Sequence, residues 1–548
     1  MRLALAYLIL LMLAGCGAHD PVGPVRFANS PPVWKVNDRI DTAKAPKAIP
    51  FLRGFYHFTS FYLRATRGLW LERDRRAVGT NSFDEVPDST WFTNRIGVRE
   101  VKPEEILRGP GSKEAPDKHL PWTIQSAKEG GTAIGFVVTD ARGVKFVLKF
   151  DQKHAPEIET GANIVGQRLL WAIGYNVPED HVVYFTRQDL RLAKDAYIKL
   201  DGDKKPIDAA YVDKQLAKVS VGADGRIRGN ASVFIAGKPL GGAPRLGVRR
   251  DDPNDTIPHQ LRRDQRGQAS LFAWLSHTDI KEDNTFDAFQ KDPRDPDVEY
   301  VVHYLIDFGN AFGTQSKVRH RHYPDYQYEV DLKEWGKSIV SLGLQRQPWE
   351  GRVDPELPGI GLYSAEMFDP GTWKANTFAQ LPLLYADRID QFWGAKLAMR
   401  FSRVQIEAAV EAARYTNARS KKYLVDTIVA RQRIVGAYWF ARTNPIDEVR
   451  FDGGQLCFVD LALRHQLVTT QTTFAVQSFD RQGRSLEARK GVAAAANGNT
   501  CVTPTWAAGG ARYTIVNVES SRGMPGTLIH LALDPATQQP RVIGIYRQ

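Results

Sequence analysis

The sequence predicts an α+β fold in which a β-rich region is followed by a mainly helical region and then by a C-terminal all-β sandwich domain. Three observations predict this order. Apolar and polar residues alternate as in strands over 121–150, apolar residues recur at helical spacing over 375–442, and short strands with Gly-rich turns follow from residue 446. The chain has 548 residues, which is too long for one hydrophobic core and also indicates several domains.

The composition is that of a globular protein. Hydrophobic residues make up 43% of the chain and charged residues 25%, which excludes a wholly disordered chain, a collagen-like fibre and a polytopic membrane protein. Lys and Arg number 73 against 62 Asp and Glu, so the formal net charge is +11. Because the basic residues are scattered and form no dense stripe, we expect no binding of nucleic acid.

Residues 1–15 have the pattern of a secretory signal peptide. Arg2 precedes an apolar run over 3–13, which is shorter than the roughly 20 residues needed to span a bilayer. The segment Leu13-Ala14-Gly15-Cys16 resembles the bacterial lipobox, which implies that Cys16 is lipidated and becomes the mature N-terminus. Gly17 stands where an inner-membrane retention signal has Asp, so the resemblance implies an anchor in the outer membrane of a bacterial cell envelope, facing the periplasm or the surface. The alternative is an ordinary cleavable signal with an incidental Cys.

The other two cysteines, Cys457 and Cys501, both fall in the strand-rich C-terminal region. In an oxidising compartment we expect them to form a disulfide, because a bridge that closes a loop of about 45 residues stabilises the fold by about 4 kcal/mol in the chain-entropy model. The alternative is a pair of buried free thiols.

The chain divides into consecutive parts by composition and pattern. Residues 16–50 are rich in Pro and Lys and are expected to form a tether, and residues 51–120 an N-terminal extension that packs on the main fold. The β-rich lobe is predicted over 121–215, the helical lobe over 216–442 and the β-sandwich over 446–548.

Within the β-rich lobe the pattern predicts a hairpin, a strand, a helix and another strand. Pro156 opens the helix and Gly174 ends it. Residues 190–260 indicate a long polar connection with short strands, and residues 265–277 indicate a helix. The predicted strands lie at 122–124, 136–138, 144–150 and 181–185.

Three segments of the chain occur in an informative order. Lys149 lies on a predicted strand, residues 277–284 read His-Thr-Asp-Ile-Lys-Glu-Asp-Asn, and Asp307-Phe308-Gly309 follows an apolar strand. This resembles the protein-kinase-like superfamily, in which a strand Lys, H-R-D-L-x-x-x-N and D-F-G occur in the same order. The resemblance implies the two-lobed protein-kinase-like fold, with a small β-rich N-lobe and a mainly helical C-lobe. Thr278 and Ile280 replace the Arg and Leu of the family motif.

The resemblance implies a nucleotide site that uses Mg²⁺ and ATP. Lys149 would hold the phosphates, and Gly130, Gly131 and Gly135 would let a loop lie close over them. Asn284 and Asp307 would be the metal ligands, because Mg²⁺ prefers hard oxygen atoms.

The same resemblance assigns the acid–base groups. Asp279 would orient the acceptor hydroxyl and take its proton, and Lys281 would stabilise the transferred phosphoryl group. A Glu on the following helix normally pairs with the strand Lys, and the two candidates are Glu157 and Glu159; Glu159 is favoured because it shares a helix face with Ala162 and Asn163.

The sequence also departs from ordinary kinases. The loop from Lys149 to the helix is short, residues 291–296 indicate an inserted turn between Asn284 and Asp307, and no convincing A-P-E element follows D-F-G. With these departures the sequence is more similar to atypical branches of the superfamily, such as the HipA-like or spore-coat CotH-like kinases. The resemblance covers roughly residues 120–400.

Two adjacent arginines, Arg262 and Arg263, precede the catalytic-loop motif. They are candidates for a clamp on a phosphate or acidic substrate, because guanidinium groups bind such anions in a bidentate way. The alternative is a solvated charged loop before the next helix.

Two functions remain open. The first is transfer of a phosphate or nucleotidyl group from Mg–ATP to a hydroxyl of a protein or small molecule. The second is a catalytically inactive pseudokinase scaffold whose β-domain binds an envelope partner or a glycan, which fits a compartment without a maintained ATP pool. Retention of Lys149, Asp279, Asn284 and Asp307 together favours activity.

Overall fold

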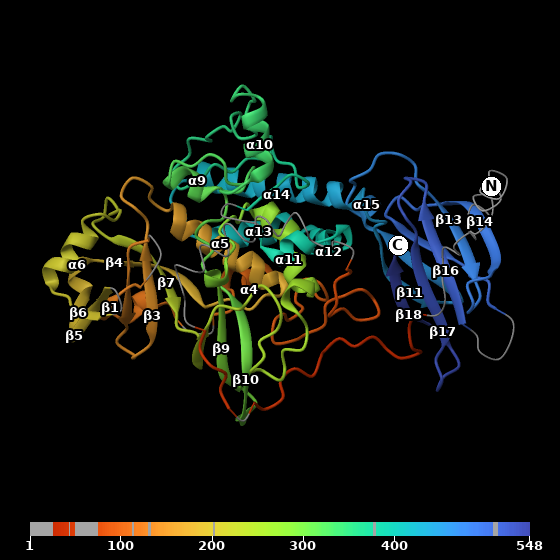
Figure 1. Ribbon diagram of the computed structural model, residues 1–548, viewed down its shortest axis with the longest axis horizontal. Coiled ribbons are helices and arrows are strands. Elements are labelled where there is room, and N and C mark those ends of the chain that lie inside the picture. Colours follow the sequence, from red (N-terminus) through yellow and green to blue (C-terminus); the bar gives the residue numbers. More distant parts are fainter. Residues whose placement is uncertain are drawn as a thin grey trace, which may run out of the picture. The chain divides into compact units, whose positions relative to one another are not determined.

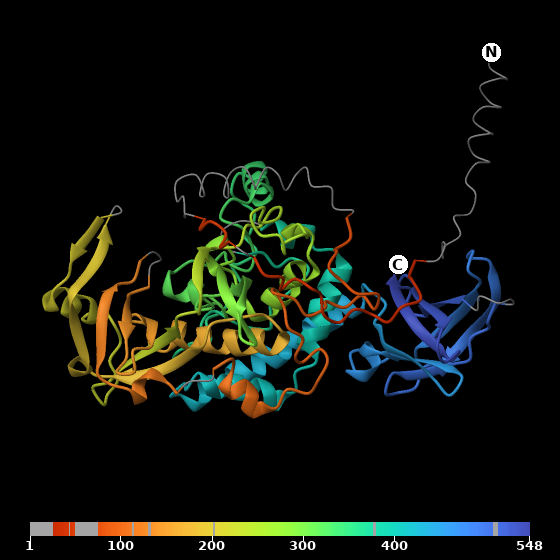
Figure 2. The same ribbon diagram turned by 90° about the horizontal axis from the view of Figure 1, so that it is seen from below.

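The computed structural model describes residues 26–42, 44–49, 75–111, 114–129, 133–200, 203–375, 380–507 and 513–548. The fold is mixed α+β, and the chain divides into two compact units (Figures 1 and 2). The larger unit comprises residues 35–79 and 86–438, and the smaller unit comprises residues 1–34, 80–85 and 439–548. Among the described residues no helix is both long enough and apolar enough to span a membrane.

The larger unit begins with a seven-stranded sheet in the order β4-β7-β3-β2-β1-β5-β6. Neighbouring strands are antiparallel, except that β1 and β5 are parallel. The strands are β1 (Trp122–Ala127), β2 (Gly135–Thr139), β3 (Lys145–Phe150), β4 (Asp180–Phe185), β5 (Leu190–Leu200), β6 (Asp203–Pro206) and β7 (Ile227–Val233).

Alternation along β3 decides which face of this sheet is buried. Phe146, Leu148 and Phe150 join the core between the sheet and α6 (Ala209–Leu216), whereas Lys149 points to the opposite face. Because β7 inserts between β3 and β4, the β-rich part extends to Val233, and the predicted boundary at residue 215 is wrong. The predicted polar connection after residue 190 likewise contains an 11-residue strand, β5.

The helix after β3, α5 (Ile158–Ile173), starts close to the end of the strand, as predicted. Asp151 makes this short connection possible, because its carboxylate accepts hydrogen bonds from the Glu159 and Thr160 N–H groups, both at 2.9 Å. These N–H groups would otherwise lack partners at a helix start. The helix ends where Gly174 N–H donates to Leu170 O at 3.1 Å.

The rest of the larger unit is mainly helical and contains a three-stranded sheet in the order β10-β9-β8. Its strands are β8 (Lys238–Gly241), β9 (Thr285–Asp292) and β10 (Asp295–Leu305). Its helices are α7 (Arg263–Arg266), α8 (Gln268–Leu275), α9 (Thr314–Val318), α10 (Leu332–Val340), α11 (Leu381–Tyr385), α12 (Arg388–Met399), α13 (Arg403–Ala412) and α14 (Ala418–Phe440).

The N-terminal residues are divided between the two units. Residues 86–111, which include α4 (Pro103–Arg108), pack on the larger unit, where Trp91 stacks on His303 with 3.6 Å between ring centroids. Residues 80–85 belong to the smaller unit instead, so the predicted extension is not one body. The described part of the predicted tether is also packed: Ile49 N–H donates to Leu240 O in the larger unit, and Phe27 contacts His530 in the smaller unit.

The smaller unit contains sheets of three and five strands, in the orders β11-β12-β15 and β14-β13-β16-β17-β18. Side chains of both sheets, including Phe458 and Val516, form one hydrophobic core. The predicted disulfide between Cys457 and Cys501 is confirmed, and it joins directly paired positions of β12 and β15. The elements are β11 (Ile446–Asp452), β12 (Gln455–Asp460), α15 (Leu461–Arg464), β13 (Thr473–Phe479), β14 (Ser485–Ala493), β15 (Asn499–Val502), β16 (Tyr513–Ser520), β17 (Thr527–Leu533) and β18 (Pro540–Arg547).

Candidate functional site

The candidate site is a cleft in the larger unit, formed by the β-rich sheet, α5 and the segments that flank β9 and β10. The free space between its lining side chains, including the open solvent at its mouth, is about 590 Å³. Four cationic side chains and three carboxylates line it, a balance suited to an anionic ligand. These residues are Lys128, Lys149, Glu159, Asp279, Lys281, Asp307 and Arg319.

Lys149 enters the cleft from near the C-terminal end of β3. Its ammonium group forms an ion pair with Asp307, with 2.9 Å between Nζ and Oδ1. Gly135 lies directly opposite Lys149 in the β2–β3 ladder, and a Cβ at that position would approach Leu148 O to 2.5 Å. The Gly is therefore required for close packing beside the Lys, whereas Gly130 and Gly131 lie outside the described residues.

Neither Glu157, which precedes α5, nor Glu159, in its first turn, forms the predicted pair with Lys149, whose ion pair is with Asp307. Glu157 turns away and accepts a hydrogen bond from Thr416 N–H. Glu159 lines the cleft, where burial and the nearby Asp151 raise its pKa to about 7. The preference for Glu159 over Glu157 thus agrees with its position, but the pairing itself is not present.

The predicted catalytic loop begins where α8 ends, with Ser276 in the left-handed region at φ 49°. His277 follows as a buried side chain, packed against Phe308 with 5.7 Å between ring centroids. Burial lowers the pKa of His277 to about 4, so the ring is neutral at pH 7. This residue is therefore a packing element that joins the loop to the D-F-G segment.

Asp279 lies in the cleft with two polar neighbours on the same carboxylate oxygen. Lys281 Nζ is 3.2 Å from Asp279 Oδ2, and Asn310 Nδ2 donates to the same atom at 2.9 Å. Asn284 supports the loop from behind, because its side-chain N–H group donates to the backbone oxygen of Asp279. Asn284 itself is 6% exposed and does not line the cleft.

The β9–β10 hairpin explains how Asn284 and Asp307 come together despite their wide separation in sequence. Asn284 directly precedes β9 and Asp307 closely follows β10, and the register pairs Thr285 with Leu305. Ile306 N–H then donates to Asn284 O at 3.0 Å. The predicted inserted turn over 291–296 is thus the tip of this hairpin and part of two regular strands.

Asp307 has an unusual backbone and an unusual acidity. Its φ of 64° lies in the left-handed region, which Asp adopts more readily than most non-Gly residues. The surrounding protein raises its pKa, but attraction and hydrogen bonding to Lys149 outweigh this and lower the pKa to about 2. The side chain, 40% exposed, is therefore an anion that faces the cleft.

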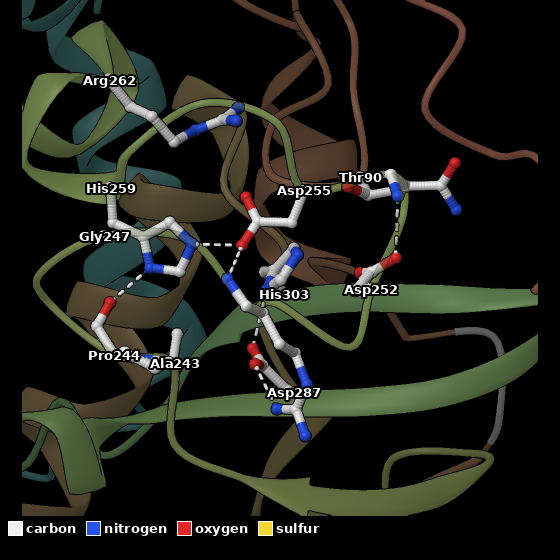
Figure 3. Close-up of polar contacts among 12 residues, drawn as sticks. Thr90, Ala243, Pro244, Gly247, Asp252, Asp255, His259, Arg262, Asp287 and His303 are labelled. Atoms are coloured by element: carbon white, nitrogen blue, oxygen red, sulfur yellow. Dashed lines mark hydrogen bonds and ion pairs between the residues drawn. The ribbon is translucent and has the colours of Figure 1, made fainter. Parts of the chain in front are cut away.

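A buried polar network holds the base of the hairpin (Figure 3). Asp287 on β9 accepts from Arg249 at 3.2 Å, and its other oxygen lies 2.7 Å from Nδ1 of His303 on β10. A second pair, His259 and Asp255, lies beside it at 2.7 Å. Because these groups are almost fully buried, we assign the network to positioning the hairpin.

Arg262 and Arg263 do not form the predicted clamp. Both are buried: Arg262 pairs with Asp264 at 2.9 Å, and Arg263 pairs with Asp390 on α12 at 2.7 Å. Figure 3 shows Arg262 at the edge of the buried network. A guanidinium group that is removed from water needs such a partner, so these residues stabilise the helical part and line no part of the cleft.

Two charged cleft residues, besides polar ones such as Asn310, were missed from the sequence. Lys128 follows β1, and burial together with repulsion by Lys149 lowers its pKa to about 8. Arg319 follows α9, and its charge acts on Glu159 across the cleft. Lys128 directly precedes the Gly-rich segment, which was a usable signal, whereas Arg319 was indistinguishable from the basic residues around it.

In the described part of the chain no group of three or more His, Cys, Asp or Glu side chains is arranged to hold a metal ion. The expected ligands differ from such a group, since they are one carboxylate, Asp307, and one amide, Asn284. Comparison with models of known protein families gives no match, and comparison with curated protein sequences gives none either. The functional argument therefore depends on the geometry of the cleft.

Proposed function

We propose that the cleft binds a Mg²⁺–nucleoside triphosphate and transfers its phosphoryl or nucleotidyl group to a hydroxyl of a protein or small molecule, as an atypical kinase-like enzyme. The observation that carries the proposal is the convergence of Lys149, Asp279 and Asp307 on one cleft, with Asn284 directly behind Asp279. The third strand of the sheet supplies the Lys and the following helix supplies Glu159, which is the placement expected of a kinase-like small lobe.

The cationic and anionic residues of the cleft would have different roles. Lys149 and Lys128 would neutralise the phosphate oxygens from the side of the sheet, and Lys281 would act on the group in transfer. Asp279 would accept the proton of the acceptor hydroxyl, and Asn310 and Lys281 hold its carboxylate in place. Pre-placed charges of this kind supply most of the catalysis expected in phosphoryl transfer.

The residues present fit Mg²⁺. Asp307 is ionised at neutral pH and partly exposed, and the amide oxygen of Asn284, behind Asp279, would have to turn toward the cleft to be the second hard ligand atom. The ion would supply further charge neutralisation at the phosphate oxygens. To bind it, Asp307 would have to share or exchange its contact with Lys149.

The Lys149–Asp307 ion pair also favours a second candidate function, a pseudokinase scaffold, because it occupies the carboxylate that a metal would need. In that case the β-domain would bind an envelope partner or a glycan. For either function we propose a lipid-anchored protein of the bacterial outer membrane. This rests on the lipobox-like segment ending at Cys16, which lies outside the described residues.

Titration of the protein with ATP, with and without Mg²⁺, tests the proposal by thermal shift and by transfer of labelled phosphate. We expect saturable stabilisation that Asp307→Ala abolishes. Asp297→Ala, at an exposed position on β10, is the matched control and should bind like the wild type. The absence of any shift at millimolar nucleotide would refute nucleotide chemistry, and a shift without transfer to any offered acceptor would favour the scaffold.

A further inference from the structure

Two buried oxygen atoms near the Lys149–Asp307 ion pair have no hydrogen-bond partner among the described residues. They are Oδ1 of Asn230 on β7 and Oδ1 of Asp180 on β4, and each of these residues is 2% exposed. We call these two atoms the buried acceptors. A buried acceptor without a donor costs free energy, so its presence in a folded protein needs an explanation. One explanation is a donor that reaches it in another state of the site.

The register of the sheet places both buried acceptors on the face that carries Lys149. Asn230 is the direct partner of Lys149 in the β3–β7 ladder, and Asp180 is the partner of Ser232, two residues further along β7. Directly paired residues share a face and side chains alternate along a strand, so all four side chains face the same way. Ala231, which lies between the two β7 residues, joins the hydrophobic core on the other face.

The charged groups around Asp180 indicate that Lys149 is the donor. Burial raises the pKa of Asp180, against the opposing effects of its hydrogen bonds and of the charges of Lys149 and Arg168. Arg168 is held elsewhere, because it donates to the backbone oxygen of Asp180 at 3.1 Å and to the side chain of Gln167. The Lys149 ammonium group has three donors, and its ion pair with Asp307 leaves others for a second acceptor.

Asn163 on α5 connects Asp180 to the D-F-G segment. Its Nδ2 donates to Asp180 Oδ2 at 2.7 Å, and its Oδ1 accepts from Phe308 N–H at 2.9 Å. The Ser232 hydroxyl also favours the ionised form of Asp180, but among the described residues no hydrogen bond reaches Oδ1. Since Phe308 directly follows Asp307, one side chain fixes both carboxylates that act on Lys149.

We propose that the buried acceptors of Asn230 and Asp180 receive the Lys149 ammonium group when Asp307 turns to a bound Mg²⁺. This inference rests on the function proposed above and adds two positioning residues to it. In the structure Lys149 is held by Asp307, and it loses this contact when Asp307 becomes a metal ligand. The buried acceptors would then keep the ammonium group at the phosphates, instead of leaving it to the solvent or to Glu159.

The movement required of Lys149 is small. Directly opposite residues in neighbouring strands have Cβ atoms about 4.5–5.5 Å apart, and Asn230 has this relation to Lys149. The four-carbon stem of a Lys is flexible, so a change of rotamer moves the ammonium group while the backbone of β3 stays in place. Asn230 lines the cleft itself, so it lies between the ligand and Asp180.

A crystal structure of the Asp307→Ala variant tests the position of Lys149 without any nucleotide. Removal of the carboxylate frees the ammonium group, and we expect Lys149 Nζ at about 3 Å from Oδ1 of Asp180 or of Asn230. A Lys149 side chain that turns to Glu159 or to solvent would overturn the proposal, whatever the protein binds.

Nucleotide binding tests the buried acceptors with Asp307 intact. Calorimetry measures the affinity for ADP with and without Mg²⁺, and the ratio of the two affinities reports how readily Asp307 leaves Lys149. Asp180→Asn should lower this ratio by about tenfold or more, because Lys149 loses a charged acceptor. Asn230→Leu should lower the ratio by less, because its amide oxygen is neutral. Asp195→Asn, at an exposed position on β5 of the same sheet, should leave it unchanged.

The ratio separates positioning from a structural effect. A merely structural role of Asp180 would lower both affinities and the melting temperature together, so an unchanged ratio in Asp180→Asn overturns the proposal. If the wild-type protein binds no ADP at all, the function proposed above fails. The Asp307→Ala structure then decides by itself whether the buried acceptors receive Lys149.

Discussion

The ammonium group of Lys149 on β3 lies 2.9 Å from the carboxylate of Asp307, which follows β10. One ion pair therefore joins the β-rich sheet to the segment that the hairpin carries into the cleft. The pair also sets the acidity of both partners: Asp307 has a pKa of about 2, and the pKa of Lys149 is raised because the attraction of Asp307 outweighs the effect of burial. A triphosphate that entered the cleft would compete with Asp307 for this ammonium group.

Replacing Lys149 should therefore weaken nucleotide binding. We expect Lys149→Met to lower the affinity for Mg–ATP by about tenfold or more, since a charge-assisted contact contributes about 1.5–3 kcal/mol. Lys145→Met, at an exposed position on the same strand, is the matched control for any general effect of charge. Calorimetric titration measures both, and equal affinities for the two variants would contradict the assignment of Lys149.

Asp279 should matter for transfer and little for binding. Asp279→Asn keeps the size of the side chain and its contact range with Lys281 and Asn310 but removes the base. We expect the rate of transfer to fall by about 10²–10⁴-fold, the range typical of a positioned general base. Single-turnover transfer of labelled phosphate measures the rate. An unchanged rate at saturating nucleotide would exclude Asp279 as the proton acceptor.

Binding of a polyanion should weaken as the pH rises from 6 to 9. Below pH 7 Glu159 is neutral and Lys128 is charged, because their pKa values are about 7 and about 8. Above pH 8 Glu159 is an anion and Lys128 has lost its charge, so repulsion of phosphate grows. Glu159→Gln should flatten the part of the profile near pH 7.

The control for this pH profile is the affinity of the Glu159→Gln variant divided by the affinity of the wild type. The nucleotide itself titrates near neutral pH, but the ratio of the Glu159→Gln affinity to the wild-type affinity at each pH cancels that effect. We expect the ratio to rise with pH through about 7 and then level off. A ratio that is constant from pH 6 to 9 would show that Glu159 does not face the ligand.

Much of this fold could be predicted because its signals are local. The alternation along β3, the helix that ends at Gly174 and the late strands around Cys457 and Cys501 all depend on residues close in sequence or on a single cysteine pair. The division of residues 80–85 from residues 86–111 could not be predicted, because it is decided by long-range contacts.

Local sequence signals also predicted part of the site. Lys149, Asp279 and Asp307 were found through motifs with fixed spacing, and they do line one cleft. The partner of Lys149 was not found, because the choice between Glu159 and Asp307 depends on how the sheet and the hairpin approach each other. Arg263 was misassigned because its partner Asp390 lies more than a hundred residues away in sequence.

The buried position of Arg263 makes a prediction about stability. Asp390 pairs with Arg263 at 2.7 Å and with Arg266 at 3.3 Å, and burial raises the pKa of Asp390 to about 6 despite these cations. Asp390→Ala would leave two buried guanidinium groups without this partner, and we expect it to lower the free energy of unfolding by about 3–5 kcal/mol. Denaturant unfolding of the intact chain measures this loss.

An exposed pair supplies the comparison. Glu407 pairs with Arg403 on the surface of α13 at 2.9 Å, and Glu407→Ala should cost only about 0.3–0.5 kcal/mol. If Asp390→Ala is as mild as Glu407→Ala while Arg263→Ala mainly reduces ligand affinity, the clamp assignment of Arg263 would be restored.

The disulfide should stabilise the smaller unit to a measurable extent. Cys457 and Cys501 are separated by 44 positions and bridge β12 and β15, so the bond removes chain entropy from the unfolded state. We expect replacement of both by Ser to cost about 2–4 kcal/mol, close to the cost of reducing the wild type. Hydrogen exchange at the amides of β12 and β15 locates the effect. Reductant should leave the Ser variant unchanged, whereas a reductant effect on that variant, or none on the wild type, would show that the bond does not stabilise these strands.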